Sequence, residues 1–152
     1  MEHRAATRNA PVDAVVIYES LTGNTAKAGK ACAEGHPDAG LPTRAYPIKE
    51  IDYQALSNAD LVIVGSWVDG FVVVGQRAGR LGRIKGMPAL SGKKAVVYLT
   101  YAIDAGKALQ KMSDAVTARG AEVLGGQLIR RDKLDEGVAD FVDRVLQVSS
   151  TA

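Results

Sequence analysis

Short apolar runs of strand length alternate along this chain with longer segments of helical periodicity. Apolar runs predict strands at residues 14–18, 43–48, 60–65, 95–100 and 122–129. Apolar residues at three- and four-residue spacings, bounded by Gly and Pro, predict helices at residues 25–34, 105–119 and 134–148. This alternation predicts an α/β fold in which helices cover both faces of a parallel sheet.

Glycine and proline modify this pattern in three places. Prolines at both ends of the second predicted strand, Pro42 and Pro47, mark it as an edge strand. A glycine pair, Gly125 and Gly126, interrupts the last predicted strand. Between the third and fourth strands, glycines recur at Gly75, Gly79, Gly82 and Gly86. Because each interior glycine costs a helix about 1 kcal/mol relative to alanine, that segment is predicted to be mobile or non-helical.

Hydroxyl groups and one glycine follow the first strand, where a parallel sheet binds its ligands. Ser20, Thr22 and Thr25 place three hydroxyls around Gly23, at the start of the next helix. Free N–H groups and the positive end of the helix dipole point the same way, which favours a phosphate site. The same residues could simply cap the helix. A nucleoside-triphosphate loop is excluded, because five residues separate Gly23 from Gly29 where that loop has four. Ala31 also stands where that loop needs a magnesium-binding hydroxyl.

Aromatic residues gather on the loops after the third and fourth strands. Trp67 and Phe71 belong to the first of these loops, and Tyr101 to the second. Because the carboxyl ends of parallel strands meet at one edge, a flat aromatic ligand could be stacked there. The alternative is that Trp67 or Phe71 covers the end of the core.

Length and composition indicate one domain at residues 12–148, with tails at 1–11 and 149–152. A single cysteine, Cys32, fits a reducing cytoplasm and is most simply a buried or half-buried apolar residue. No apolar run is long enough to span a membrane. Two isolated histidines, His3 and His36, are expected to be solvated surface residues.

Charge adds one candidate surface. The net charge of +2 is too small to indicate nucleic-acid binding, and no aromatic residues are interleaved to stack on bases. Basic residues nevertheless cluster at Arg77, Arg80, Arg83 and Lys85. The cluster is either a solvated helix face or a docking surface for an acidic partner.

The Ser-x-Thr-Gly-x-Thr turn and the Gly-Ser-Trp loop resemble those of the flavodoxin family, and the resemblance covers about residues 12–148. It implies a three-layer α-β-α sandwich, with a five-stranded parallel sheet of order 2-1-3-4-5 that holds one non-covalent flavin mononucleotide (FMN). The cofactor-binding residues that it implies are Ser20, Leu21, Thr22, Gly23, Asn24, Thr25, Ser66, Trp67, Val68, Asp69, Gly70, Phe71, Thr100, Tyr101, Ala102 and Asp104.

Each loop has its own role in this resemblance. The first loop wraps the flavin phosphate, and Trp67 lies against the isoalloxazine ring. Backbone groups of residues 68–70 approach the reactive N5 edge. Tyr101 and Ala102 border the ring, while Asp104 lies nearby or caps the next helix. The chain departs from the family pattern because no Thr separates Ser66 from Trp67, and because residues 72–74 are all valine.

The resemblance favours an FMN-binding redox protein that carries electrons between protein partners. The basic cluster, in contrast to the acidic surface usual in that family, would place their docking near Arg77, Arg80 and Arg83. In that function the cofactor supplies the chemistry, so no side chain need be a catalytic acid, base or nucleophile, and no metal ligand set is expected. One alternative is an FMN-dependent reductase of a quinone or other flat small molecule. Another is an interaction module of the same fold with a weak or empty flavin site.

Overall fold

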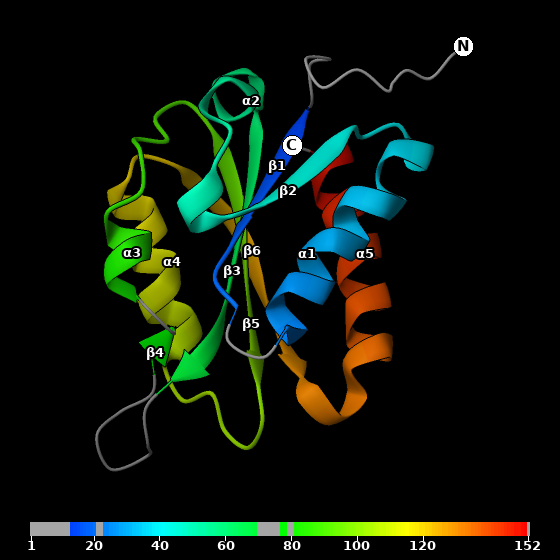
Figure 1. Cartoon of the computed structure of the whole chain (residues 1–152), viewed down its shortest axis with the longest axis vertical. Helices are drawn as coiled ribbons and strands as arrows, with labels where there is room; N and C mark the ends of the chain where they lie inside the picture. Colours follow the sequence, from blue (N-terminus) through cyan, green and yellow to red (C-terminus); the bar gives the residue numbers. More distant parts are fainter. Residues whose placement is uncertain (1–12, 21–22, 70–76, 79–80, 152) are drawn as a thin grey trace.

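The computed structural model describes residues 13–20, 23–69, 77–78 and 81–151 (Figure 1). Its strands are β1 (Ala14–Tyr18), β2 (Thr43–Pro47), β3 (Leu61–Asp69), β4 (Arg77–Ala78), β5 (Lys94–Tyr101) and β6 (Glu122–Arg130). Its α-helices are α1 (Asn24–Gly35), α2 (Tyr53–Asn58), α3 (Leu81–Lys85), α4 (Ala108–Ala118) and α5 (Leu134–Thr151). Three short 3₁₀ helices are η1 (Pro37–Ala39), η2 (Ile48–Glu50) and η3 (Arg131–Lys133).

Five of the strands form a parallel sheet in the order β2-β1-β3-β5-β6, and β4 pairs antiparallel with the end of β3. Without β4, this is the expected order 2-1-3-4-5. The expected α/β class and the edge position of the second strand are confirmed. The sheet therefore brings the carboxyl ends of β1, β3 and β5 together, which is where a ligand site is expected.

Alternating side chains of β1 build the two cores on either face of the sheet. Val15 and Ile17 join a cluster that α2, α3 and α4 cover. Val16 and Tyr18 join the cluster under α1 and α5. Both helical layers are visible in Figure 1, with α3 and α4 on one side of the sheet and α1 and α5 on the other. The continuous apolar run of β1 is thus explained by burial on both faces.

Close packing around Tyr98 requires a glycine in the middle of the sheet. A Cβ on Gly65 would overlap the Tyr98 ring, so only glycine leaves room for that ring beside β3. The ring also packs against Phe141 of α5, with centroids 4.8 Å apart and planes tilted by 47°. The position of Tyr98 matters for the site, because its hydroxyl reaches α1.

Several expected boundaries are wrong. The segment expected to be non-helical contains α3, although Gly82 lies within it, and Gly75 and Gly79 lie outside the described residues. The last strand continues through Gly125 and Gly126, with a bulge that shifts the register between Ala95 and Val96. The last helix, expected to end at Val148, continues to Thr151.

His36 is buried rather than solvated, which corrects the expectation of a surface residue. Its Nε2 donates to the Val142 carbonyl at 3.1 Å, and its Nδ1 lies 3.3 Å from the Thr43 hydroxyl. Burial lowers the pKa of His36, and the hydrogen bond to Val142 opposes this effect. His36 therefore ties the end of α1 to β2 and α5. His3 lies outside the described residues.

Candidate functional site

The turn after β1 is shaped by the Ser20 hydroxyl and by Gly23. Ser20 Oγ accepts hydrogen bonds from the N–H groups of Gly23 at 3.1 Å and of Ala26 at 3.3 Å. Gly23 has φ +100°, in the left-handed region that favours glycine, and its surroundings are open to 4 Å. A side chain at this position would be strained, which explains why glycine stands directly before α1.

Donor groups at the start of α1 fit a phosphate. In the described part of the chain, no acceptor meets the N–H groups of Asn24 and Thr25. The N-cap residue is Gly23, which has no side chain that could accept a bond from them. Such N–H groups, together with the helix dipole, favour an anion. The Ser20 hydroxyl accepts both of its bonds within the described residues, so its own proton is a further donor. These residues therefore fit a phosphate group.

Thr25 brings the first and third predicted loops together. Its buried hydroxyl lies 3.0 Å from the Thr100 hydroxyl, and its carbonyl accepts a hydrogen bond from the Tyr98 hydroxyl at 2.8 Å. Burial raises the pKa of Tyr98 well above 10.0, so this hydroxyl stays protonated and remains a donor. Thr25 and Thr100, both proposed to contact the cofactor, thus also fasten α1 to β5.

Glu19 and Arg83 form an ion pair beside this turn. Arg83 Nη1 lies 2.8 Å from Glu19 Oε2 and 3.2 Å from Oε1. The Glu19 side chain is 6% exposed and that of Arg83 is 37% exposed. Glu19 directly precedes Ser20, so the guanidinium neutralises a carboxylate next to the candidate phosphate site. Sequence reasoning did not pair these two residues, because 64 positions separate them and no local pattern connects them.

The residues expected in a loop after the third strand belong to β3 itself. Ser66 is buried, while Trp67 and Val68 are half-buried. β3 continues to Asp69 because its end pairs with β4, and Val68 lies opposite Ala78. Trp67 is in register with Thr100 of β5, so the tryptophan and the Thr100–Tyr101 end of β5 lie at the same rim of the sheet.

The loop after β5 is largely exposed. Tyr101 is half-buried, Ala102 is exposed, and Ile103 is 93% exposed. Asp104 Oδ1 accepts a hydrogen bond from the Gly106 N–H at 3.0 Å. This bond shapes a turn that delays the start of α4 to Ala108, three residues after the expected start.

Four of the predicted site residues lie outside the described residues, namely Leu21, Thr22, Gly70 and Phe71, as do the valines 72–74. The described residues bring together Ser20, Thr25, Thr100, Trp67 and Tyr101 at one edge of the sheet. They also place Ile103 there, which sequence reasoning did not single out. Only the structure shows that the Ile103 side chain is exposed at this edge.

Two kinds of site are absent from the described part of the chain. Among the described residues, no three His, Cys, Asp or Glu side chains form a group that could hold a metal ion. Within the described residues, no helix has both the length and the apolar character needed to cross a membrane.

Known proteins share this sequence pattern and architecture. A family model described as a flavodoxin domain matches residues 15–151. A curated flavodoxin from Clostridium beijerinckii is 24% identical over 128 residues, which cover 84% of this chain and 93% of that protein.

Two solved structures are similar in fold. A solution structure of two-electron reduced flavodoxin from Megasphaera elsdenii has a TM-score of 0.68 at 15% identity, and the match covers 88% of this chain and 98% of that one. An oxidised flavodoxin 1 from Bacillus cereus has a TM-score of 0.67 at 20% identity, covering 91% of this chain and 98% of that one. Because the family model spans most of the chain, the protein belongs to the flavodoxin family, whose cofactor is FMN.

Proposed function

We propose that this protein carries electrons between partner proteins by means of an FMN held at the carboxyl edge of its sheet. The observation that supports this most directly is the turn after β1. There, the Ser20 hydroxyl, the start of α1 and the N–H groups of Asn24 and Thr25, which meet no acceptor among the described residues, provide a donor set for the FMN phosphate. The flavin supplies the redox chemistry when it is bound, and the protein supplies binding and orientation.

Residues on β3 and β5 provide the remaining part of the proposed site. Trp67 and Tyr101, both half-buried, offer aromatic surface at the rim where the phosphate turn also ends. Val68, Asp69 and Gly70 are proposed to approach the ring through their backbone, and Ala102 and Asp104 to border it. Leu21, Thr22, Gly23 and Phe71 complete the set implied by the family resemblance.

A titration with two ligands tests the phosphate assignment. FMN and riboflavin share the flavin ring, but only FMN carries the phosphate. We expect Ser20→Ala to weaken FMN binding by about tenfold or more, because a charge-assisted hydrogen bond and two backbone contacts are lost, and to leave riboflavin binding unchanged. Fluorescence quenching of the flavin measures both dissociation constants. Ser57→Ala, at an exposed position in α2, is the matched control.

Two outcomes would contradict the proposal. If wild-type protein in excess leaves the FMN spectrum and fluorescence unchanged, the chain holds no flavin. If Ser20→Ala weakens FMN and riboflavin equally, the phosphate does not lie in this turn. Steady turnover of a quinone with a nicotinamide cofactor and no added protein would instead favour a reductase.

Partner docking is proposed near Arg77, Arg80 and Arg83, at the end of β3 and around α3. Only Arg83 has a described side chain among them, and its charge is shared with Glu19. We therefore expect docking to depend less on Arg83 than on a cation that has no carboxylate partner. The reduction rate of a partner protein at low and high salt, compared between wild type and Arg83→Gln, measures the contribution of Arg83.

A further inference from the structure

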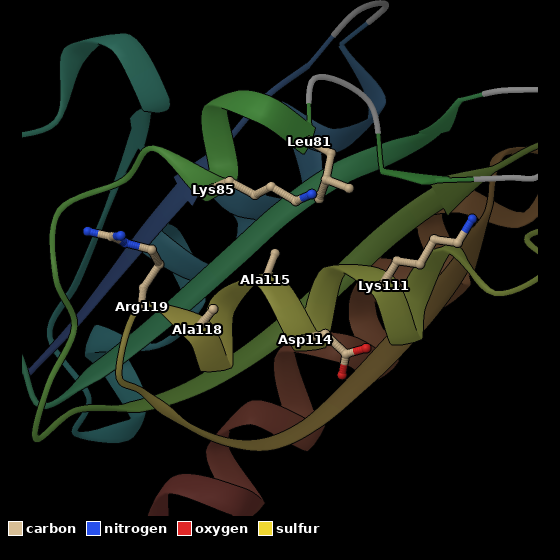
Figure 2. Close-up of a pocket in the computed structure, with 7 residues that line it drawn as sticks. All are labelled: Leu81, Lys85, Lys111, Asp114, Ala115, Ala118 and Arg119. Atoms are coloured by element: carbon tan, nitrogen blue, oxygen red, sulfur yellow. The ribbon is translucent and has the colours of Figure 1, made fainter.

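A groove of about 460 Å³ lies between α3 and α4, and none of its lining residues belongs to the candidate flavin site. Its apolar lining comes from Leu81 of α3 and from Ala115 and Ala118 of α4. Figure 2 shows Leu81 and Lys85 on one helix facing the two alanines on the other. Small side chains on α4 thus leave an open depression beside α3.

Positive charge surrounds this depression. Lys85, Lys111 and Arg119 line it, against a single carboxylate, that of Asp114. The Asp114 carboxylate already accepts a hydrogen bond from the Gln110 amide at 2.9 Å. Lys85 is exposed and forms no ion pair with any residue that the structure describes. The groove is therefore complementary to a negatively charged ligand.

Arg119 adds a donor without an acceptor. Its backbone is held at the end of α4, where its carbonyl accepts a hydrogen bond from the Leu90 N–H at 2.7 Å. Its side-chain Nε is buried and has no hydrogen-bond partner within the described part of the chain. A carboxylate is the acceptor that binds a guanidinium most strongly, so the positive charge of Arg119 favours a carboxylate at this end of the groove.

We propose that this groove binds an extended acidic segment of a partner protein, in which two carboxylates flank an apolar residue. Lys111 and Arg119 are eight positions apart on one helix, so they are separated by about 12 Å along its axis. Four steps of an extended chain cover about 13 Å, and residues i, i+2 and i+4 point to the same side. The pattern Glu-x-Leu-x-Glu therefore places its acids at both ends of the groove and leucine against Ala115 and Ala118.

A helical ligand fits this groove less well. An α-helix with its side chains is about 10–12 Å wide and rises only about 1.5 Å per residue, so a helical ligand needs about eight residues to reach from Lys111 to Arg119. An extended segment is narrower, so it can lie along the whole length.

A second copy of this chain is a poorer occupant of the groove, because its own acid-x-Leu-x-acid segment is not extended. Residues 132–136 read Asp-Lys-Leu-Asp-Glu, but they lie in η3 and the first turn of α5 rather than in an extended segment. Asp132 is paired with Arg130 at 2.9 Å, and Asp135 with Lys27 at 2.7 Å. A separate partner with a free acidic segment therefore fits the observations better.

The test uses the full chain, both FMN-loaded and FMN-free, and a fluorescein-labelled peptide Gly-Glu-Ser-Leu-Ser-Glu-Gly. We expect anisotropy to give a dissociation constant below about 1 mM, with the same value for both forms of the protein. The matched peptide with Gln in place of Glu should bind about tenfold more weakly or worse. Raising NaCl from about 50 to about 300 mM should also weaken binding, since exposed charges are screened.

Four variants locate the binding. We expect Arg119→Gln to weaken the peptide about tenfold and Lys85→Gln about threefold, because the second cation is more exposed. Ala118→Leu keeps a good helix former and fills the groove, so it should also abolish most binding. Lys30→Gln, an exposed lysine of α1 on the other face of the sheet, should have no effect. Circular dichroism checks that each variant is folded.

Several results would overturn the proposal. Binding that survives both Lys85→Gln and Ala118→Leu would place the peptide elsewhere, and an equal loss in Lys30→Gln would indicate non-specific attraction. Displacement of the peptide by glutarate at the same concentration as unlabelled peptide would indicate a site for small anions. Self-association that Lys85→Gln abolishes would make a second copy the occupant. Because FMN-free protein is included, failure of the flavin proposal leaves this test intact.

Discussion

Replacing Arg83 by glutamine should destabilise the protein, because it removes the cation beside the buried Glu19 carboxylate. The Nη1 to Oε2 distance is 2.8 Å, and the carboxylate side chain is only 6% exposed. Removing one partner of a fully buried pair costs about 3–5 kcal/mol. The Arg83 side chain is 37% exposed, so water can enter part of the space it leaves. We therefore expect Arg83→Gln to lower the free energy of unfolding by about 2 kcal/mol.

Urea unfolding of the single and double variants measures this effect. For a domain of this size, with a slope of about 2 kcal/mol per M, the midpoint should fall by about 1 M. Adding Glu19→Gln should recover at least about 1 kcal/mol, which is the coupling expected between contacting charged residues. Lys27→Gln is the control. It breaks a shorter ion pair, at 2.7 Å, whose side chains are 56% and 87% exposed, so the midpoint should not change measurably.

Two outcomes would refute this reasoning. If the effects of Arg83→Gln and Glu19→Gln add within about 0.5 kcal/mol, the two side chains are not coupled. If Lys27→Gln lowers the midpoint as much as Arg83→Gln, burial does not decide the effect. The same variants test the phosphate turn, because Arg83→Gln should weaken FMN and the added Glu19→Gln should restore its affinity.

Three further predictions concern buried groups. Burial holds the pKa of His36 below 6.5, so the unfolded state binds more protons than the folded state as the pH falls through that value. The free energy of unfolding should therefore drop towards pH 5, and His36→Gln should flatten this pH dependence in urea melts. Gly65→Ala should cost about 1–3 kcal/mol, because its Cβ overlaps the Tyr98 ring, whereas Gly125→Ala, with no atom within 4 Å, should cost nothing. Burial raises the pKa of Cys32 to about 12, so a thiol reagent at pH 8 should label it only when urea unfolds the chain.

Elements that depend on local sequence were predictable here. The run Leu61–Val64 is apolar on every side chain, as a central parallel strand requires, and it is indeed buried on both faces. The helix α1 begins and ends within one residue of its predicted bounds, because Gly23 and Gly35 mark both ends. The hydrogen bonds from Gly23 and Ala26 to Ser20 are likewise local, since they join residues within six positions of one another.

Features that depend on distant residues were not predictable. His36 looked like a polar residue in a turn, and only the packing of Thr43 and Val142 around it makes it buried. The strand β3 looked complete at Gly65, but pairing with β5 extends it through Trp67, and pairing with residues 77–78 extends it to Asp69. A single sequence holds no signal for either contact, because the partners belong to other elements.

The basic cluster shows why sequence proximity misleads about function. Arg83 and Lys85 are two positions apart on α3, so the helix turns them to different sides. Arg83 points to Glu19 at the end of β1, where it neutralises a carboxylate next to the phosphate turn. Lys85 lines the groove towards α4 and meets no carboxylate among the described residues. One short helix therefore places one cation beside the proposed cofactor site and another in the proposed groove for an acidic segment, so Arg83→Gln and Lys85→Gln perturb different sites.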